Sequence, residues 1–222
     1  MKRKIGIILV MQNKATSLIK HFKMKTIMEE CTINFFLNHN ASVILSSNGT
    51  SIQYLVDNVG TQPATLNAYI LITKFKPYLI INAITASGFY SQGTQIGDVF
   101  LGSEKYVFHD RRIPIPGFYE YGIGYYYAHV DEKYLKGLEV KRGFISTGNS
   151  LDSSQKDIDM LNELNAFVND MESATIAWVC SLFNMSFIAI KSITDFVDKG
   201  EVESDFLMNF ELASINFAKS YN

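Results

Sequence analysis

The sequence has few of the features that mark a secreted, membrane-spanning or nucleic-acid-binding protein. It holds only two cysteines, Cys31 and Cys180, in 222 residues. They are too few for a disulfide framework, so we expect a reduced, cytoplasmic chain. No apolar stretch approaches the roughly 20 residues of a membrane-spanning helix. The formal net charge is −2, whereas a protein that neutralises nucleic-acid phosphates needs a basic surface. We therefore predict neither a membrane nor a nucleic acid as a partner.

The chain also lacks a linker and a convincing signal peptide. No Pro/Gly/Ser-rich stretch, charge block or low-complexity tract divides it, so we predict one domain over residues 1–222. A basic start is followed by the short apolar run 5–11, after which no small-residue cleavage site occurs. A buried first strand explains this run better than a signal peptide does.

Several motifs of common catalytic sites are missing too. The sequence has no CxxC or HExxH metal motif, no GxSxG nucleophile motif, and no P-loop or GxGxxG run. Metal, serine-hydrolase and nucleotide-phosphate chemistry are therefore not favoured. His109, followed by Asp110, has two interpretations. It is either a base oriented by a carboxylate or a hydrogen-bonded structural histidine, and the second is favoured.

Short apolar runs alternate along the chain with stretches of helical periodicity. The pattern predicts an α/β fold, in which a mixed, mostly parallel sheet is covered by helices on both faces. We expect strands at residues 5–11, 43–47, 78–82, 98–102, 106–109, 144–147 and 187–190, and helices at 15–22, 63–75, 172–183 and 206–219.

The stretch 169–198 brings two isolated carboxylates to one place. A helix over 172–183 rises roughly 18 Å, and six strand residues from Phe187 return roughly 20 Å. Glu172 and Asp195 should therefore lie on the same edge of the sheet, beyond the carboxyl ends of the strands, where ligands bind in open α/β folds. Such a pair, without a metal, suits general acid catalysis by one carboxylate and binding of substrate hydroxyls by the other. The same reasoning brings further polar residues to this edge, at 12–14, 85–88 and 149–152.

Motifs in order along nearly the whole chain carry a family resemblance. They are MQNKA at 11–15, DNVGTQPATL at 57–66, IGDVFL at 96–101, FHDRRIPIP at 108–116, STGNSLDSS at 146–154, MESATIAWVC at 171–180 and KSITDFVD at 191–198. The chain resembles the plant-type 5′-methylthioadenosine/S-adenosylhomocysteine nucleosidases of the nucleoside phosphorylase and nucleosidase superfamily. The resemblance implies a three-layer α/β/α fold, a homodimer and no cofactor. It also implies hydrolysis of the N-glycosidic bond of methylthioadenosine, a step of methionine salvage, with adenosylhomocysteine as a second possible substrate.

The resemblance also assigns roles to residues. Asp195 matches the general acid that protonates N7 of adenine, and Glu172 matches the glutamate that accepts hydrogen bonds from the ribose 2′ and 3′ hydroxyls. Each has a structural alternative, since either carboxylate can cap a helix. The other substrate-binding candidates are Met171 and Thr85 near the sugar, Leu151 and the backbone of Asp152 at the base, Asp170, and the aromatic residues Phe118, Tyr119 and Tyr121 at the alkylthio pocket. A purely structural role for the aromatic residues is equally open.

The sequence departs from the family pattern at three positions. Lys14 stands where plant-type members carry the glutamate that helps to activate the attacking water, and Ile84 and Ser87 replace small, glycine-like residues. An ammonium group cannot take a proton from water. Three hypotheses follow, in order of preference. They are a nucleosidase with impaired activity, a protein that binds nucleosides or adenine without turnover, and a purine nucleoside phosphorylase in which Lys14 helps to hold phosphate.

Overall fold

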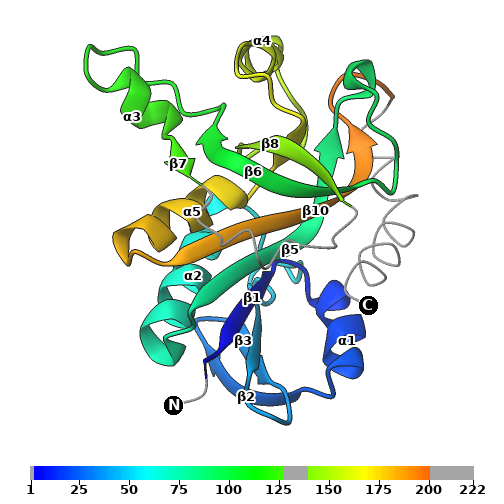
Figure 1. The fold of residues 1–222 in the computed structure, drawn as a ribbon, viewed down its shortest axis with the longest axis vertical. Helices are drawn as coiled ribbons and strands as arrows, with labels where there is room; N and C mark the ends of the chain where they lie inside the picture. The colour runs from blue at the N-terminus through cyan, green and yellow to red at the C-terminus, as the bar shows by residue number, and fades with distance from the viewer. Residues whose placement is uncertain (1–2, 128–139, 201–222) are drawn as a thin grey trace.

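The described strands of this chain form one mixed sheet, and helices cover both of its faces (Figure 1). The computed structural model describes residues 3–127 and 140–200. The strands are β1 (Ile5–Leu9), β2 (Lys25–Glu30), β3 (Ile33–Leu37), β4 (Val43–Ser47), β5 (Leu79–Gly88), β6 (Val99–Phe108), β7 (Tyr126–Tyr127), β8 (Lys141–Thr147), β9 (Val168–Asp170) and β10 (Ser186–Phe196). The helices are α1 (Gln12–His21), α2 (Thr61–Phe75), α3 (Tyr119–Ile123), α4 (Gln155–Glu163), α5 (Ser173–Leu182) and the 3-10 turn η1 (Tyr90–Gln92).

Parallel pairing runs through the centre of the sheet. Strands β4, β1, β5 and β10 are neighbours in that order, and all run in the same direction. β10 pairs antiparallel with β6, β6 parallel with β8, β8 parallel with β9, and β9 antiparallel with β5. Strands β5, β10, β6, β8 and β9 therefore close into a ring, while β1, β4, β3 and β2 extend from it as an open sheet. The mixed sheet predicted from the sequence is confirmed, whereas the ring was not predicted.

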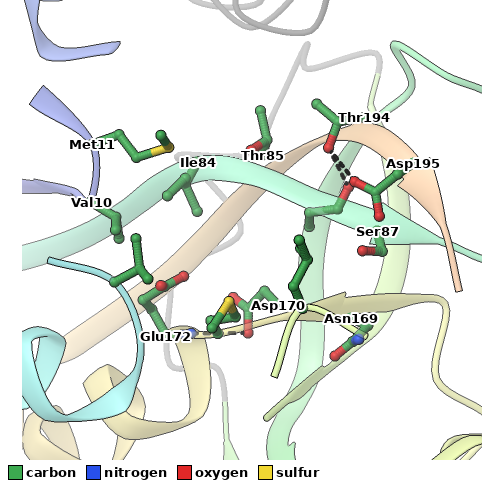
Figure 2. A pocket seen from close by; sticks show the side chains of 14 residues that line it. Val10, Met11, Ile84, Thr85, Ser87, Asn169, Asp170, Glu172, Thr194 and Asp195 are labelled. Atoms are coloured by element: carbon green, nitrogen blue, oxygen red, sulfur yellow. Dashed lines mark hydrogen bonds between the residues drawn. The ribbon is translucent and has the colours of Figure 1, made fainter. Parts of the chain in front are cut away.

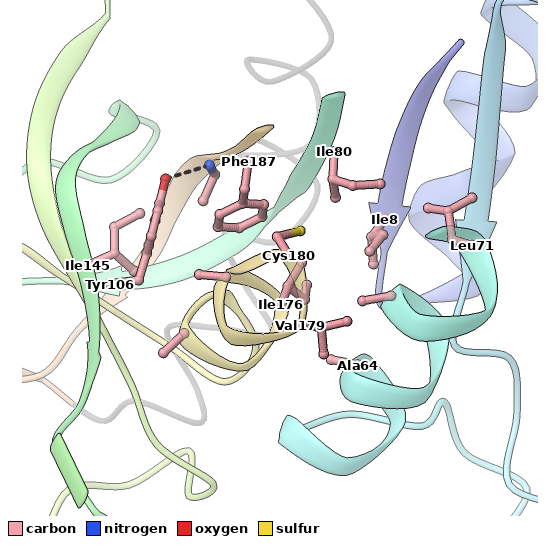
Figure 3. Close-up of a cluster of buried hydrophobic side chains, with 14 of the residues drawn as sticks. Ile8, Ala64, Leu71, Ile80, Tyr106, Ile145, Ile176, Val179, Cys180 and Phe187 are labelled. Carbon is pink, nitrogen blue, oxygen red and sulfur yellow. Dashed lines mark hydrogen bonds between the residues drawn. The ribbon is translucent and has the colours of Figure 1, made fainter. Parts of the chain in front are cut away.

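Both faces of the central strands are buried, which explains why these strands read as continuous apolar runs. Along β1, Ile8 packs in a cluster with α2 and α5, whereas Ile7 and Leu9 pack on the opposite face with Ala15 and Leu18 of α1. Figure 3 shows the first cluster, where α2 and α5 lie against the sheet. Because α1 covers the other face, the predicted three-layer arrangement is confirmed.

Some predicted boundaries need correction. The runs 98–102 and 106–109 belong to one strand, β6, whose pairing with β8 shifts register in between and so interrupts the regular pattern. Strand β10 continues to Phe196, so Asp195 lies inside the strand rather than just past its end. The predicted helix 206–219 lies outside the described residues.

Several short elements were absent from the prediction, among them the β2–β3 hairpin and helix α4. The hairpin of β2 and β3 has a largely exposed, polar first strand, which weakens its apolar signal. Helix α4 begins with a capping box, in which the Ser154 hydroxyl and the Asp157 carboxylate each accept from the other's backbone N–H. The longest described helix, α2, has 15 residues. No helix in the described ranges is long and apolar enough to cross a membrane.

Candidate active site

A cavity of about 230 Å³ opens where the carboxyl ends of β1, β5 and β10 meet the start of α5 (Figure 2). Glu172 and Asp195 lie on opposite sides of it in this view. The length argument therefore placed both carboxylates correctly in one site. The cavity is lined by Val10, Met11, Val59, Ile84, Thr85, Ala86, Ser87, Leu151, Asn169, Asp170, Met171, Glu172, Thr194 and Asp195.

The Glu172 carboxylate sits at the N-terminus of α2. The residue is only 3% exposed, and the backbone N–H of Gly60, which precedes the helix, donates to its Oε1 over 3.1 Å. The N-terminus of a helix favours a negative charge because its free N–H groups point outward. The Glu172 carboxylate therefore faces the positive end of the α2 dipole.

Asp170 anchors the start of α5 rather than pointing freely into the cavity. Its carboxylate accepts from the Ser173 backbone N–H over 3.1 Å and from the Thr147 hydroxyl over 2.6 Å. It also forms an ion pair of 2.6 Å with Lys191, and both side chains are fully buried. Burial opposes its ionisation, but Lys191 and these hydrogen bonds hold the pKa of Asp170 below its usual range. A direct contact of Asp170 with substrate stays a prediction.

Lys191 is the centre of this buried network. Besides the ion pair, its ammonium group donates to Oδ1 of Asn82, whose amide in turn donates to the carbonyl of Ile8. The network therefore joins β10, β5 and β1 to the junction of β9 and α5. Met171 and Glu172 lie in this junction, so the network fixes the backbone that carries them.

Asp195 lies on the side of the cavity away from Glu172. It is 1% exposed, and the Thr194 hydroxyl donates to its Oδ1 over 2.6 Å. Its position pairs with Ser87 across β10 and β5. The carboxyl is therefore shielded from water, as a carboxyl that keeps a proton requires.

The remaining predicted residues fall into two groups. Thr85, Met171 and Leu151 line the cavity. Asp152, Phe118 and Tyr119 are exposed and are not among the lining residues of this single chain, so their contacts with substrate stay predictions.

Lys14 is placed by its backbone alone. It belongs to the first turn of α1, three residues after Met11, which lines the cavity. Its side chain lies outside the described part of the structure. The other two departures from the family pattern, Ile84 and Ser87, both line the cavity. All three differences therefore occur at or next to the site.

Sequence reasoning brought Asn149 to this edge of the sheet but did not predict that it ties three loops together at the cavity. Oδ1 of Asn149 accepts from the backbone N–H and the hydroxyl of Thr61, over 3.1 and 2.8 Å. The Asn149 backbone N–H donates to Asp110 over 2.8 Å. The start of α2 and the loops after β6 and β8 are thus joined, which holds the segment that carries Leu151. All three residues lie in the motifs of the resemblance, which was the available signal.

His109 agrees with the structural interpretation. It is buried, and its Nδ1 lies 3.1 Å from the Ser146 hydroxyl. Burial lowers the pKa of His109, so the ring stays neutral near neutral pH. It is not among the residues that line the cavity.

Together, the fold and the cavity define an α/β protein with a cavity of small-molecule size at the carboxyl ends of its parallel strands. The family model of the phosphorylase superfamily matches residues 4–220. The chain belongs to this superfamily. The resemblance found in the sequence is thus confirmed.

Individual relatives narrow this comparison. The chain is 43% identical over 160 residues to the 5′-methylthioadenosine nucleosidase of Arabidopsis thaliana, an alignment that covers 72% of this chain and 60% of the relative. It is 40% identical over 166 residues to the 5′-methylthioadenosine/S-adenosylhomocysteine nucleosidase of the same plant, covering 74% of this chain and 65% of the relative. These alignments thus span less than two thirds of either relative.

A solved structure covers more of the chain. The apo form of the Arabidopsis thaliana 5′-methylthioadenosine nucleosidase superposes with a TM-score of 0.93 at 32% identity, covering 99% of this chain and 93% of that chain. The predicted nucleoside phosphorylase-like fold is confirmed by this match.

Proposed function

We propose that this chain hydrolyses the N-glycosidic bond of an adenine nucleoside of the 5′-methylthioadenosine type and releases adenine. The observation that carries the proposal is the cavity in which Glu172 and Asp195 lie on opposite sides (Figure 2). One carboxylate is held at a helix N-terminus and the other is shielded from water. The names of the two Arabidopsis relatives support the choice of substrate.

The reaction divides between these two residues. Asp195 transfers its proton to N7 of the base, and the C1′–N9 bond breaks with its electron pair moving to the departing adenine. Because the Thr194 hydroxyl donates to Oδ1 of Asp195, Oδ2 is the oxygen that carries the transferred proton. The sugar carbon, left cationic, takes the oxygen of a water molecule, which then loses a proton to bulk water, and Asp195 regains a proton from bulk water. Glu172 holds the two ribose hydroxyls, and its negative charge favours the developing cation.

A second candidate function is binding of the nucleoside or adenine without turnover. It is favoured by Lys14 in the first turn of α1, where the family resemblance places a water-activating glutamate. A lysine ammonium donates hydrogen bonds but cannot accept a proton. Loss of a positioned base costs roughly 10² to 10⁴-fold in rate, so hydrolysis by this chain is expected to be slower than hydrolysis by a relative with glutamate.

Adenine release from methylthioadenosine, with and without phosphate, separates these functions. We expect release without phosphate, with methylthioribose as the second product. Tight binding of methylthioadenosine with no release would show the binding function instead. Release that requires phosphate would show phosphorolysis, the third hypothesis. Adenosylhomocysteine assayed in parallel gives the preference between the two nucleosides.

The proposal includes a homodimer. Phe118 and Tyr119 are exposed, at 53% and 40%, and they do not line the cavity of their own chain. In a dimer they are available to complete the alkylthio pocket of the partner subunit. Light scattering should give the mass of two chains, and Phe118→Ala should raise KM for methylthioadenosine without changing adenine binding. A monomer with full activity would contradict this part.

A further inference from the structure

Asn169 is a polar residue of the cavity for which the proposed reaction has no use. It is the middle residue of β9, it is only 4% exposed, and it lines the cavity. Its side-chain carbonyl, Oδ1, is buried and accepts no hydrogen bond from the described part of the chain. Buried side-chain oxygens are nearly always paired, so an exception at a cavity indicates a missing donor.

The sheet places Asn169 on the same side of the cavity as Asp195. Asn169 pairs with Ser87 across β9 and β5, and Ser87 pairs with Asp195 across β5 and β10. Residues directly opposite each other on neighbouring strands project to the same face of the sheet. Figure 2 shows the three side chains one below another, away from Glu172. The missing donor is therefore expected near the base of the nucleoside rather than near the sugar.

The chemistry of the base specifies the donor. Asp195, in its proposed role, meets N7 of a purine, and the substituent at C6 is the neighbouring exocyclic group. In adenine this substituent is an amino group with two N–H donors, whereas in hypoxanthine it is a carbonyl oxygen. A carbonyl acceptor on the protein accepts a hydrogen bond from the amino group of adenine and repels the carbonyl oxygen of hypoxanthine.

We propose that Asn169 is a specificity-determining residue, whose Oδ1 accepts a hydrogen bond from the 6-amino group of the purine and selects 6-aminopurines over 6-oxopurines. This inference rests on the proposed function, because it places the base beside Asp195. A buried acceptor left facing an acceptor loses its hydrogen bond, which is how polar sites reject close analogues.

Calorimetric titration with adenine and hypoxanthine tests the inference without requiring turnover. The wild-type chain should bind adenine about tenfold more tightly than hypoxanthine, the effect of one buried hydrogen bond. Asn169→Leu should lower adenine affinity about tenfold and leave hypoxanthine nearly unchanged. Asn169→Ala should shift the ratio in the same direction, and it decides the test if the leucine variant does not fold. An unchanged ratio in the variants, or a wild-type preference for hypoxanthine, would overturn the inference.

The matched control is Asn162→Leu, the same exchange at an exposed position of α4, which should leave both affinities unchanged. Adenine release from methylthioadenosine is measured separately on each variant. If the wild type releases adenine but the ratio does not depend on Asn169, the inference fails and the proposed function stands. If the ratio depends on Asn169 but no adenine is released, the inference stands and the proposed function fails.

Discussion

The two sides of the cavity differ in how firmly their polar groups are held. On the side of β9 and α5, the Glu172 carboxylate accepts a hydrogen bond from the start of α2. Asp170 forms an ion pair with Lys191 and accepts a hydrogen bond from the start of α5. On the side of β1, the described lining residues are apolar, Val10 and Met11, and Ile84 of β5 adds a further aliphatic side chain.

The carboxylates on the side of β9 and α5 serve both the fold and the proposed reaction. The family's water-activating residue, on the side of β1, serves the reaction alone. The anionic residues near α2 and α5 also complete helix N-termini, so the proposed binding of the sugar by Glu172 is tied to folding. Val10 and Ile84, although buried, belong to none of the apolar clusters of the described core. The β1 side is therefore the side where sequence changes alter function with the least effect on stability.

The largest expected effect comes from Asp195→Asn, at the carboxyl that lies away from Glu172. An amide in place of the carboxyl cannot deliver the proton to the base, so kcat for adenine release should fall roughly 10² to 10⁴-fold. The Thr194 hydroxyl still has an oxygen to donate to, so adenine binding should survive. The matched control is Asp198→Asn, the same exchange at an exposed residue whose carboxylate accepts a hydrogen bond from the backbone of η1. It should leave kcat within about twofold of wild type. Equal losses in both variants would remove Asp195 from the reaction.

Lys191→Met tests whether the network on the side of β9 and α5 stabilises the fold. It leaves Asp170 buried without its cation, so the free energy of unfolding in urea should fall by about 3–5 kcal/mol. Lys141→Met is the matched control, because it breaks the ion pair with Asp98 on the surface, where Lys141 is 49% exposed. A surface pair contributes about 0–1 kcal/mol. Equal losses of unfolding free energy in the two variants would show that the buried ion pair stabilises the fold no more than the surface ion pair does.

The same pair predicts a pH dependence. The pKa of Asp170 is lower in the folded chain than its ordinary value, so the unfolded chain binds a proton there more readily. The contribution of Asp170 to stability is therefore present above the unfolded pKa of about 3.9 and is lost as the pH falls through the lower folded value. Urea titrations from pH 6 downward should show this loss in the wild type and a smaller loss in Lys191→Met. Parallel curves for the two proteins would contradict the assignment to Asp170.

The sequence predicted the parts of the site that depend on local length and order. The rise of α5 and the return of β10 nearly cancel, and this was enough to place Glu172 and Asp195 together. It could not show the ring of strands, because the pairing of β9 with β5 joins Asn169 to Ser87 across 82 residues of chain. Asn169 therefore had no recognisable signal, and its partnerless carbonyl became visible only in three dimensions.

The buried lysine was hidden for a similar reason. Lys191 interrupts an apolar strand and carries a charge, so it reads as a residue that should face water. Its burial makes sense only once Asp170 and Asn82, which are distant in sequence, are seen beside it. Lys14 is the opposite case. Its importance came from the family resemblance alone, and the backbone of α1 adds only its position beside the cavity.

Lys14→Glu tests the weakly held side. It restores the carboxylate of plant-type relatives, so kcat for adenine release should rise about 10²-fold, the lower end of what a positioned base contributes. The matched control is Lys20→Glu, an exposed residue of the same helix, which makes the same change in net charge. Its kcat should stay unchanged. A similar rise in both variants would assign the effect to overall charge, and no rise in either would remove position 14 from the reaction.

The smallest expected effect comes from Glu172→Gln, which separates sugar binding on the firmly held side from base binding at Asp195. Glutamine keeps an oxygen that can accept from the Gly60 N–H, so α2 should still begin at the same place. It removes the negative charge that strengthens hydrogen bonds with the ribose hydroxyls, so KM for methylthioadenosine should rise about tenfold. Free adenine has no ribose, and its affinity should not change. If adenine affinity falls as much as nucleoside affinity, Glu172 supports the whole cavity rather than the sugar, and the division between the two carboxylates is lost.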